Sequence, residues 1–154
     1  MSITSGYSRD QLRKAYTEAW RKHTDRAPMS VQEASVATII EHHPEYQALI
    51  ADPANALAFE PGPATGRQNP FLHMGLHLAV RDQLAVDRPP GVQAVHQQLM
   101  ARLGDAHAAE HALMEALGEV LWQANRDGLA PDEQHYLALA RRRAELKRPG
   151  TSEP

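Results

Sequence analysis

The sequence predicts an all-α protein, a helical bundle of five to six helices that forms a single domain over residues 1–154. Apolar residues recur at spacings of three and four along most of the chain, which is the period of an amphipathic helix. Residues that cap helices stand at the starts of these segments, and clusters of proline and glycine separate them. No segment shows the strict alternation expected of a half-buried strand. The length of 154 residues is that of one ordinary domain.

Two helix starts are predicted in the N-terminal part of the chain. Ser8 and Ser30 are each followed three residues later by Gln or Glu, which is the spacing of a capping box. The helix after Ser30 must either end near His43 or restart with Pro44 in its first turn, because proline lacks an N–H group and clashes with the preceding turn. The segment 44–68 is expected to begin as helix and then to dissolve into a loop rich in proline and glycine.

The C-terminal half predicts longer helices. Asn69 is a predicted N-cap, and Pro70 follows it at the first helical position, so a helix is expected over about 69–87. Residues 92–125 are helical by composition, with Gly104-Asp105 as a kink or a division and Gly128 as a terminator. A last helix is expected to open at Pro131, and the residues from about 148 to form a loose tail.

Composition excludes several classes of protein. The chain has a net charge of -3 and a pI near 6.3, so no nucleic-acid partner is expected. No apolar run reaches the roughly 18 residues that span a bilayer, and no secretory signal precedes the first helix, so no membrane partner and a cytoplasmic location are expected. The absence of cysteine excludes disulfides and thiolate metal sites.

Two histidine pairs stand where the helical periodicity predicts core positions. His73 and His77 lie four residues apart in "NPFLHMGLHLAVRDQ". His107 and His111 have the same spacing, with Glu110 between them. Residues i and i+4 of a helix lie about 40° apart on one face, so each pair is expected to point in one direction. Polar groups are costly to bury without a partner, and the pattern therefore indicates a site.

A metal ion is the partner that this pattern favours. Helical bundles hold ions through side chains that project inward from two facing helices, at spacings of three or four residues. His43 is a candidate for a further nitrogen ligand, and the alternative for it is an ordinary residue at a helix end. Nitrogen and carboxylate ligands without sulfur favour Zn, Fe or Mn, as one ion or two. Glu115, Arg81 and Asp105 could orient a ligand, and the alternative for each is an exposed or capping role.

The residues leave the activity open. If one coordination position is open, the ion could activate water or bind dioxygen or peroxide, and the protein would be a metal-dependent enzyme. If the site is closed, the ion is structural. The alternative is a non-catalytic interaction module, in which the histidines form a buried hydrogen-bond network with carboxylates. A small-molecule ligand and a homo-oligomer both remain open. The sequence contains no nucleotide-binding or nucleophile-elbow motif, and "HAAEH" differs from the H-E-x-x-H of zinc proteases.

The segments "NPFLHMGLHLAVRDQLAVDRP", "LGDAHAAEHALMEALGEVLWQANRDG", "PDEQHYL" and "HPEY" resemble a family of small bacterial proteins known as a domain of unknown function. The resemblance covers about residues 30–139 and implies a bacterial, cytoplasmic protein without assigned catalytic residues. By pattern only, the chain is also similar to hemerythrin-like bundles and to metal-binding bundles related to damage-inducible and thiol-transferase proteins. The order and number of ligands differ here, so this likeness implies no oxygen-binding or thiol-transfer role.

Overall fold

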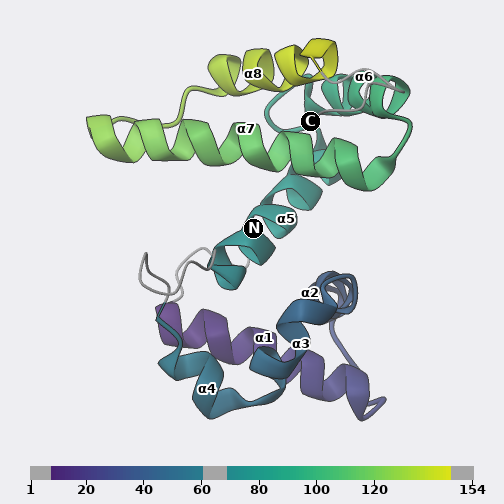
Figure 1. Cartoon of the computed structure of the whole chain (residues 1–154), viewed down its shortest axis with the longest axis vertical. Coiled ribbons are helices and arrows are strands. Elements are labelled where there is room, and N and C mark those ends of the chain that lie inside the picture. The colour runs from purple at the N-terminus through teal and green to yellow at the C-terminus, as the bar shows by residue number, and fades with distance from the viewer. Residues whose placement is uncertain (1–7, 61–68, 147–154) are drawn as a thin grey trace. The chain divides into compact units, whose positions relative to one another are not determined.

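The computed structural model describes residues 8–60 and 69–146. These ranges contain eight helices and no strand (Figure 1), which confirms the all-α class. The expected count of five to six helices was wrong. Contacts divide the chain into two compact units, residues 1–78 and 79–154. The tail predicted from about residue 148 lies outside the described residues.

The first unit begins with two capped helices. It contains the following elements together with the first part of α5 (Pro70–Val86): α1 (Arg9–Thr24), α2 (Val31–Glu41), α3 (Pro44–Ala51) and α4 (Pro53–Ala58). Both predicted capping boxes are present, at Ser8 before α1 and at Ser30 before α2. Both alternatives at the proline also hold, since α2 ends at Glu41 and Pro44 occupies the first turn of α3.

The structure has more helices than the sequence predicted because the segment that begins at Pro44 forms two short helices. The side chain of Asp52 accepts a hydrogen bond from the backbone N–H of Asn55 (3.3 Å), and Pro53 follows in the first turn of α4. This is an ordinary helix start on a helix of only six residues. So short a helix has no clear apolar period, and its stability comes from packing rather than from its own sequence.

A buried arginine holds the end of α4 against α1. Arg13 is 3% exposed, and its Nη1 donates hydrogen bonds to the carbonyl oxygens of Ala56 (2.9 Å), Leu57 (3.2 Å) and Phe59 (2.7 Å). The guanidinium carbon also lies 4.5 Å from the centre of the Phe71 ring. The last carbonyl groups of a helix have no partner within the helix, and a cation at that end is favoured by the helix dipole.

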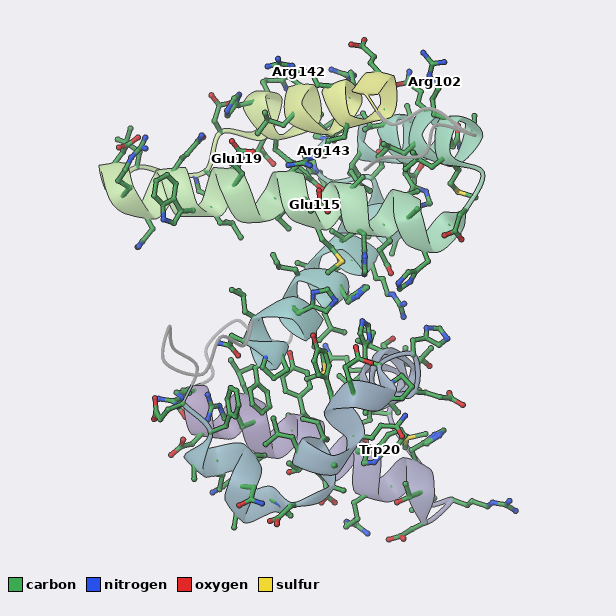
Figure 2. The ribbon with its side chains drawn as sticks, in the orientation of Figure 1. Trp20, Arg102, Glu115, Glu119, Arg142 and Arg143 are labelled. Carbon is green, nitrogen blue, oxygen red and sulfur yellow. The ribbon has the colours of Figure 1, made fainter. Side chains whose placement is uncertain are left out.

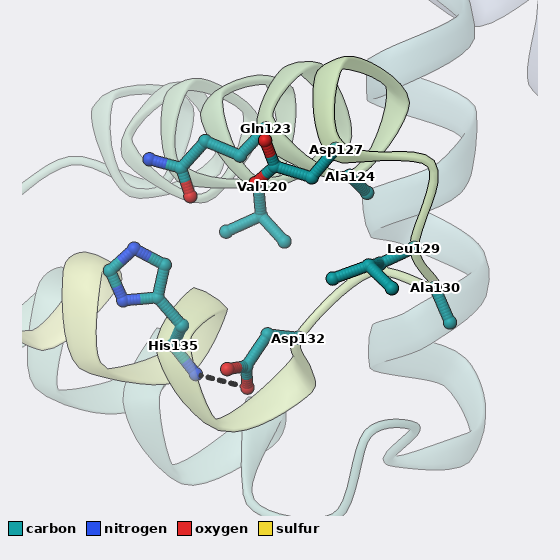
Figure 3. Close-up of a pocket in the computed structure, with 8 residues that line it drawn as sticks. All are labelled: Val120, Gln123, Ala124, Asp127, Leu129, Ala130, Asp132 and His135. Atoms are coloured by element: carbon teal, nitrogen blue, oxygen red, sulfur yellow. Dashed lines mark hydrogen bonds between the residues drawn. The ribbon is translucent and has the colours of Figure 1, made fainter.

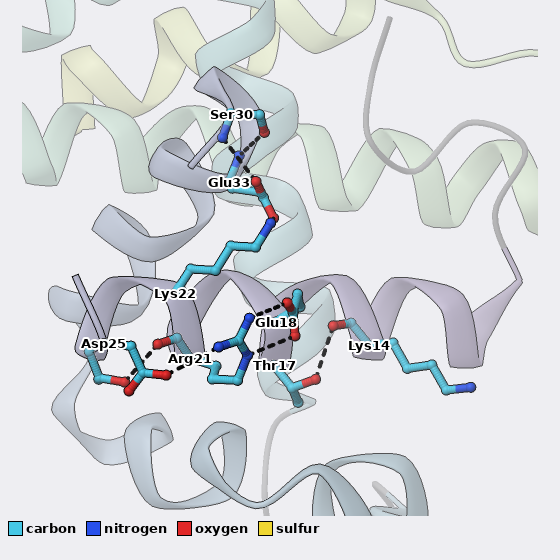
Figure 4. Close-up of polar contacts among 9 residues, drawn as sticks. Lys14, Thr17, Glu18, Arg21, Lys22, Asp25, Ser30 and Glu33 are labelled. Atoms are coloured by element: carbon cyan, nitrogen blue, oxygen red, sulfur yellow. Dashed lines mark hydrogen bonds and ion pairs between the residues drawn. The ribbon is translucent and has the colours of Figure 1, made fainter. Parts of the chain in front are cut away.

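The start of α2 is connected to α1 through Glu33 (Figure 4). One carboxylate oxygen of Glu33 accepts from the Ser30 backbone N–H (2.9 Å), and the other lies 2.8 Å from Lys22 Nζ. The hydrogen bond from Lys22, followed by those from Ser30, lowers the pKa of Glu33. A single side chain therefore completes a helix cap and an ion pair between neighbouring helices.

The second unit is built on long helices. It contains the second part of α5 and the following elements: α6 (Val92–Leu103), α7 (Ala106–Asp127) and α8 (Glu133–Leu146). Gly104 ends α6 in the left-handed region (φ 69°), and Asp105 caps α7, so the expected break at this point is a division. Gly128 ends α7 as predicted, again with positive φ (67°). The last helix begins two residues after Pro131.

The core of the second unit lies among α6, α7 and α8. Its fully buried apolar residues include Val92, Val95, Leu99, Leu113, Leu137 and Ala140. Tyr136 donates a hydrogen bond to Gln83 (2.6 Å), which ties α8 to α5. On the surface, Arg143 of α8 pairs with Glu115 of α7, and both are labelled in Figure 2. The Nη2 atom of Arg143 also lies 3.8 Å from a carboxylate oxygen of Glu119. Among the described residues, every helix is too short or too polar to cross a bilayer.

Candidate metal centre

His43 is directed into the core by the break between α2 and α3. It precedes Pro44, whose ring disfavours helical backbone in the residue before it, and its φ of -126° and ψ of 71° are non-helical. Its side chain is 5% exposed, and Nδ1 lies 2.7 Å from the carbonyl oxygen of Ile39. A carbonyl can only accept, so Nδ1 carries the proton. In the neutral ring, Nε2 therefore presents a lone pair.

The other two histidines of this cluster come from α5. Asn69 caps the helix, accepting from the backbone N–H of Phe71 (3.0 Å). One turn on, His73 is partly buried and His77 is 1% exposed. The Nε2 atom of His73 lies 3.1 Å from Nε2 of His43 and 3.2 Å from Nε2 of His77. The spacing therefore correctly predicted that the two α5 rings would meet.

The three nitrogens are placed so that they could hold a cation. A hydrogen bond between two neutral imidazoles needs one N–H and one lone pair. Because His43 offers a lone pair, a proton on His73 must be shared between His43 and His77 to satisfy both contacts. An ion could instead accept one lone pair from each ring. Tetrahedral zinc with Zn–N bonds of about 2.0–2.1 Å separates its ligands by about 3.4 Å, close to the distances found here.

An aromatic ring flanks the cluster. The Tyr46 ring is parallel to that of His43 (6° between planes, 5.2 Å between centroids) and edge-on to that of His73 (72°, 6.1 Å). Burial, with a smaller contribution from Glu45, raises the pKa of Tyr46, so the phenol stays protonated at neutral pH. The spacing of the histidines did not predict a place for Tyr46 here. Its position one turn after His43 in "HPEY" is the signal that could have identified it.

The residues predicted on α7 have partners within the second unit. The rings of His107 and His111 lie 4.2 Å apart between centroids, so they share a face as the spacing predicted, although His107 is exposed. The carboxylate of Glu110, 8% exposed, accepts two hydrogen bonds from Arg81, from Nε (2.8 Å) and from Nη2 (3.3 Å). Burial lowers the pKa of nearby His96, and the charge of Glu110 opposes this shift.

The three candidates for supporting roles have different positions. Arg81 holds a predicted ligand, as described above. Asp105 caps α7, since its carboxylate accepts from the backbone N–H groups of His107 (3.3 Å) and Ala108 (3.1 Å). Glu115 pairs with Arg143 on the surface between α7 and α8. Asp105 therefore has the capping role that was the alternative for it, and Glu115 forms a surface ion pair.

A pocket of about 190 Å³ lies between the end of α7 and the start of α8 (Figure 3). Its lining includes the apolar residues Val120 and Leu129 and the polar residues Asp127, Asp132 and His135. Asp132 accepts a hydrogen bond from the backbone N–H of His135 (3.0 Å), which caps α8. The Asp132 carboxylate thus serves the helix start, Asp127 pairs with Arg126 (2.9 Å), and none of these residues was predicted as a ligand.

Comparison with curated proteins finds no match, and comparison with solved structures finds none either. The family described as "Domain of unknown function (DUF1841)" matches residues 8–142. This range covers most of the chain and confirms the expected resemblance to a domain of unknown function. The chain belongs to the DUF1841 family.

Proposed function

We propose that this protein binds a transition-metal ion, Zn, Fe or Mn, through His43, His73 and His77. The convergence of three Nε2 atoms within the first unit is the observation that supports it best, with separations of 3.1 Å and 3.2 Å from His73 to its two neighbours. The bond from His43 Nδ1 to a backbone carbonyl is typical of metal-ligating histidines, because it fixes the tautomer and the orientation of the ring.

The ligands expected from α7 remain part of the proposal. His107 and His111 stay predicted ligands that rest on their spacing in the sequence. Glu110 is the weaker candidate, because its carboxylate already accepts two hydrogen bonds from Arg81. A carboxylate that left this guanidinium would leave a partly buried charge without its partner, which is unfavourable.

The proposed site is compatible with two roles. With an open coordination position, a bound ion would act as a Lewis acid on water or would bind dioxygen or peroxide. With four protein ligands, the ion would be structural and would join segments far apart in the chain. The rival function, an interaction module with a histidine–carboxylate network, requires no ion at all.

Metal content measured on purified variants tests the proposal. We expect wild-type protein loaded with Zn²⁺ and desalted to retain the ion, and His43→Ala and His77→Ala to lose it. His42→Ala is the matched control, because His42 is adjacent to His43 but exposed. Wild-type protein that retains none of Zn²⁺, Fe²⁺ or Mn²⁺ would refute the metal-binding proposal. Equal retention by all variants would show that the ion is bound elsewhere.

A further inference from the structure

We infer that Tyr46 is a positioning residue of the proposed metal site, whose ring holds the His43 imidazole in the orientation needed for binding. This inference rests on the proposed function, since it takes His43 as a ligand. The two ring planes differ by only 6°, with centroids 5.2 Å apart. A parallel contact of this kind restricts tilting of the imidazole on the side that Tyr46 covers.

The backbone of "HPEY" places the two rings together. Pro44 starts α3 with its φ fixed by the pyrrolidine ring. The backbone N–H of Tyr46 donates to the carbonyl oxygen of His43 (2.9 Å), which brings residue 46 back over residue 43 within the first turn. Local backbone geometry thus holds Tyr46 close to the imidazole of His43.

Two different contacts then constrain the His43 ring. Its Nδ1–H donates to the carbonyl oxygen of Ile39 (2.7 Å), so rotation about the bond from Cβ to the ring would break a buried hydrogen bond. Its face lies against Tyr46, so tilting toward that side is blocked by the phenol ring. With both contacts in place, Nε2 is held at 3.1 Å from His73 Nε2. A pre-organised ligand loses less conformational freedom when it binds.

Tyr46 acts through its ring. Its contacts with His43 and His73 are both ring-to-ring, the second at 72° with 6.1 Å between centroids. It is also packed against the hydrophobic core of the first unit, in which Phe59 has a comparable place. Phenylalanine should therefore replace Tyr46 without loss, whereas an aliphatic side chain should fill the space but fail to present a flat face.

The test compares Tyr46→Phe, Tyr46→Leu and Phe59→Leu in the full chain. Phe59→Leu is the matched control, since Phe59 is partly buried on the same core and faces Phe71 (6.2 Å between centroids). Zn²⁺ affinity is measured by competition with a chromophoric chelator, and circular dichroism checks folding. The visible absorption spectrum of Co²⁺-loaded protein reports the ligand geometry. If Tyr46→Leu does not fold, Tyr46→Met replaces it, because methionine fills the space without a ring.

We expect Tyr46→Leu to weaken Zn²⁺ binding by about tenfold or more, as loss of support around a metal ligand usually does, and to alter the Co²⁺ spectrum. Tyr46→Phe and Phe59→Leu should match wild type in both measurements. The inference is overturned if Tyr46→Leu binds as tightly as wild type, or if Phe59→Leu weakens binding equally. Wild-type protein that binds neither Zn²⁺ nor Co²⁺ would refute the proposed function and this inference together.

Discussion

Replacement of both α5 histidines by leucine, His73→Leu with His77→Leu, separates a metal site from ordinary core packing. His77 is 1% exposed, and both rings direct Nε2 into the cluster. Leucine is apolar but similar to histidine in volume. The change therefore removes the ligand nitrogens and keeps most of the packing. In protein without metal, replacing two buried imidazoles that contact each other is nearly neutral, but it also removes the neighbour of His43 Nε2, which costs about 1–3 kcal/mol.

The metal-bound protein should behave differently. An ion that binds only the native state at a concentration of 100 times its Kd raises the free energy of unfolding by about 2.7 kcal/mol. For a chain of this length, each kcal/mol corresponds to about 2–4 °C in Tm. Wild type should therefore melt about 5–11 °C higher in saturating Zn²⁺ than in chelator. The double variant should have the same Tm in both conditions.

Differential scanning calorimetry of both proteins, with Zn²⁺ and with a chelator, measures the four values. The reasoning fails if the double variant shows the same Zn²⁺-dependent rise in Tm as wild type, because the stabilising site would then lie elsewhere. It also fails if wild type shows no rise. A double variant whose Tm does not respond to Zn²⁺, compared with a wild type whose Tm rises, supports the site whatever the difference in Tm between the two proteins in chelator.

Three further predictions concern stability and are measured by urea denaturation. Arg13→Leu should lower the free energy of unfolding by about 3 kcal/mol, because it leaves three carbonyl groups at the end of α4 without their donor; a change under about 1 kcal/mol would contradict this role. Asp105→Ala removes the cap of α7 and should cost about 1 kcal/mol, whereas an unchanged midpoint would show that the cap is dispensable. Burial lowers the pKa of His96 in the folded state, so the unfolded chain takes up the proton first, and the free energy of unfolding should fall as pH drops through about 6.5. His96→Gln should make this fall with pH less steep. A variant with the same pH dependence as wild type would refute the role of His96.

The sequence indicated those features that depend on neighbours within one helical turn. The caps at Ser8, Ser30 and Asp105 and the terminator at Gly128 are hydrogen bonds or backbone conformations of adjacent residues, so their residue types identify them. The meeting of His73 with His77 follows in the same way from the helical period. The short helix α4 was missed because six residues show no clear period.

Only the tertiary structure decided which distant residues share a site. The pattern offered His43 as a candidate, but its 3.1 Å approach to His73, thirty residues later, depends on how α3 and α5 pack in the first unit. The burial of Arg13 at the end of α4 likewise depends on packing. Its residue type alone would have predicted an exposed side chain, because arginine is rarely buried. The carboxylate of Glu110 has the spacing of a ligand, yet in the second unit it accepts from Arg81. Local spacing determines which way a side chain points, whereas the partner that it meets depends on long-range packing and on which polar groups lose water together.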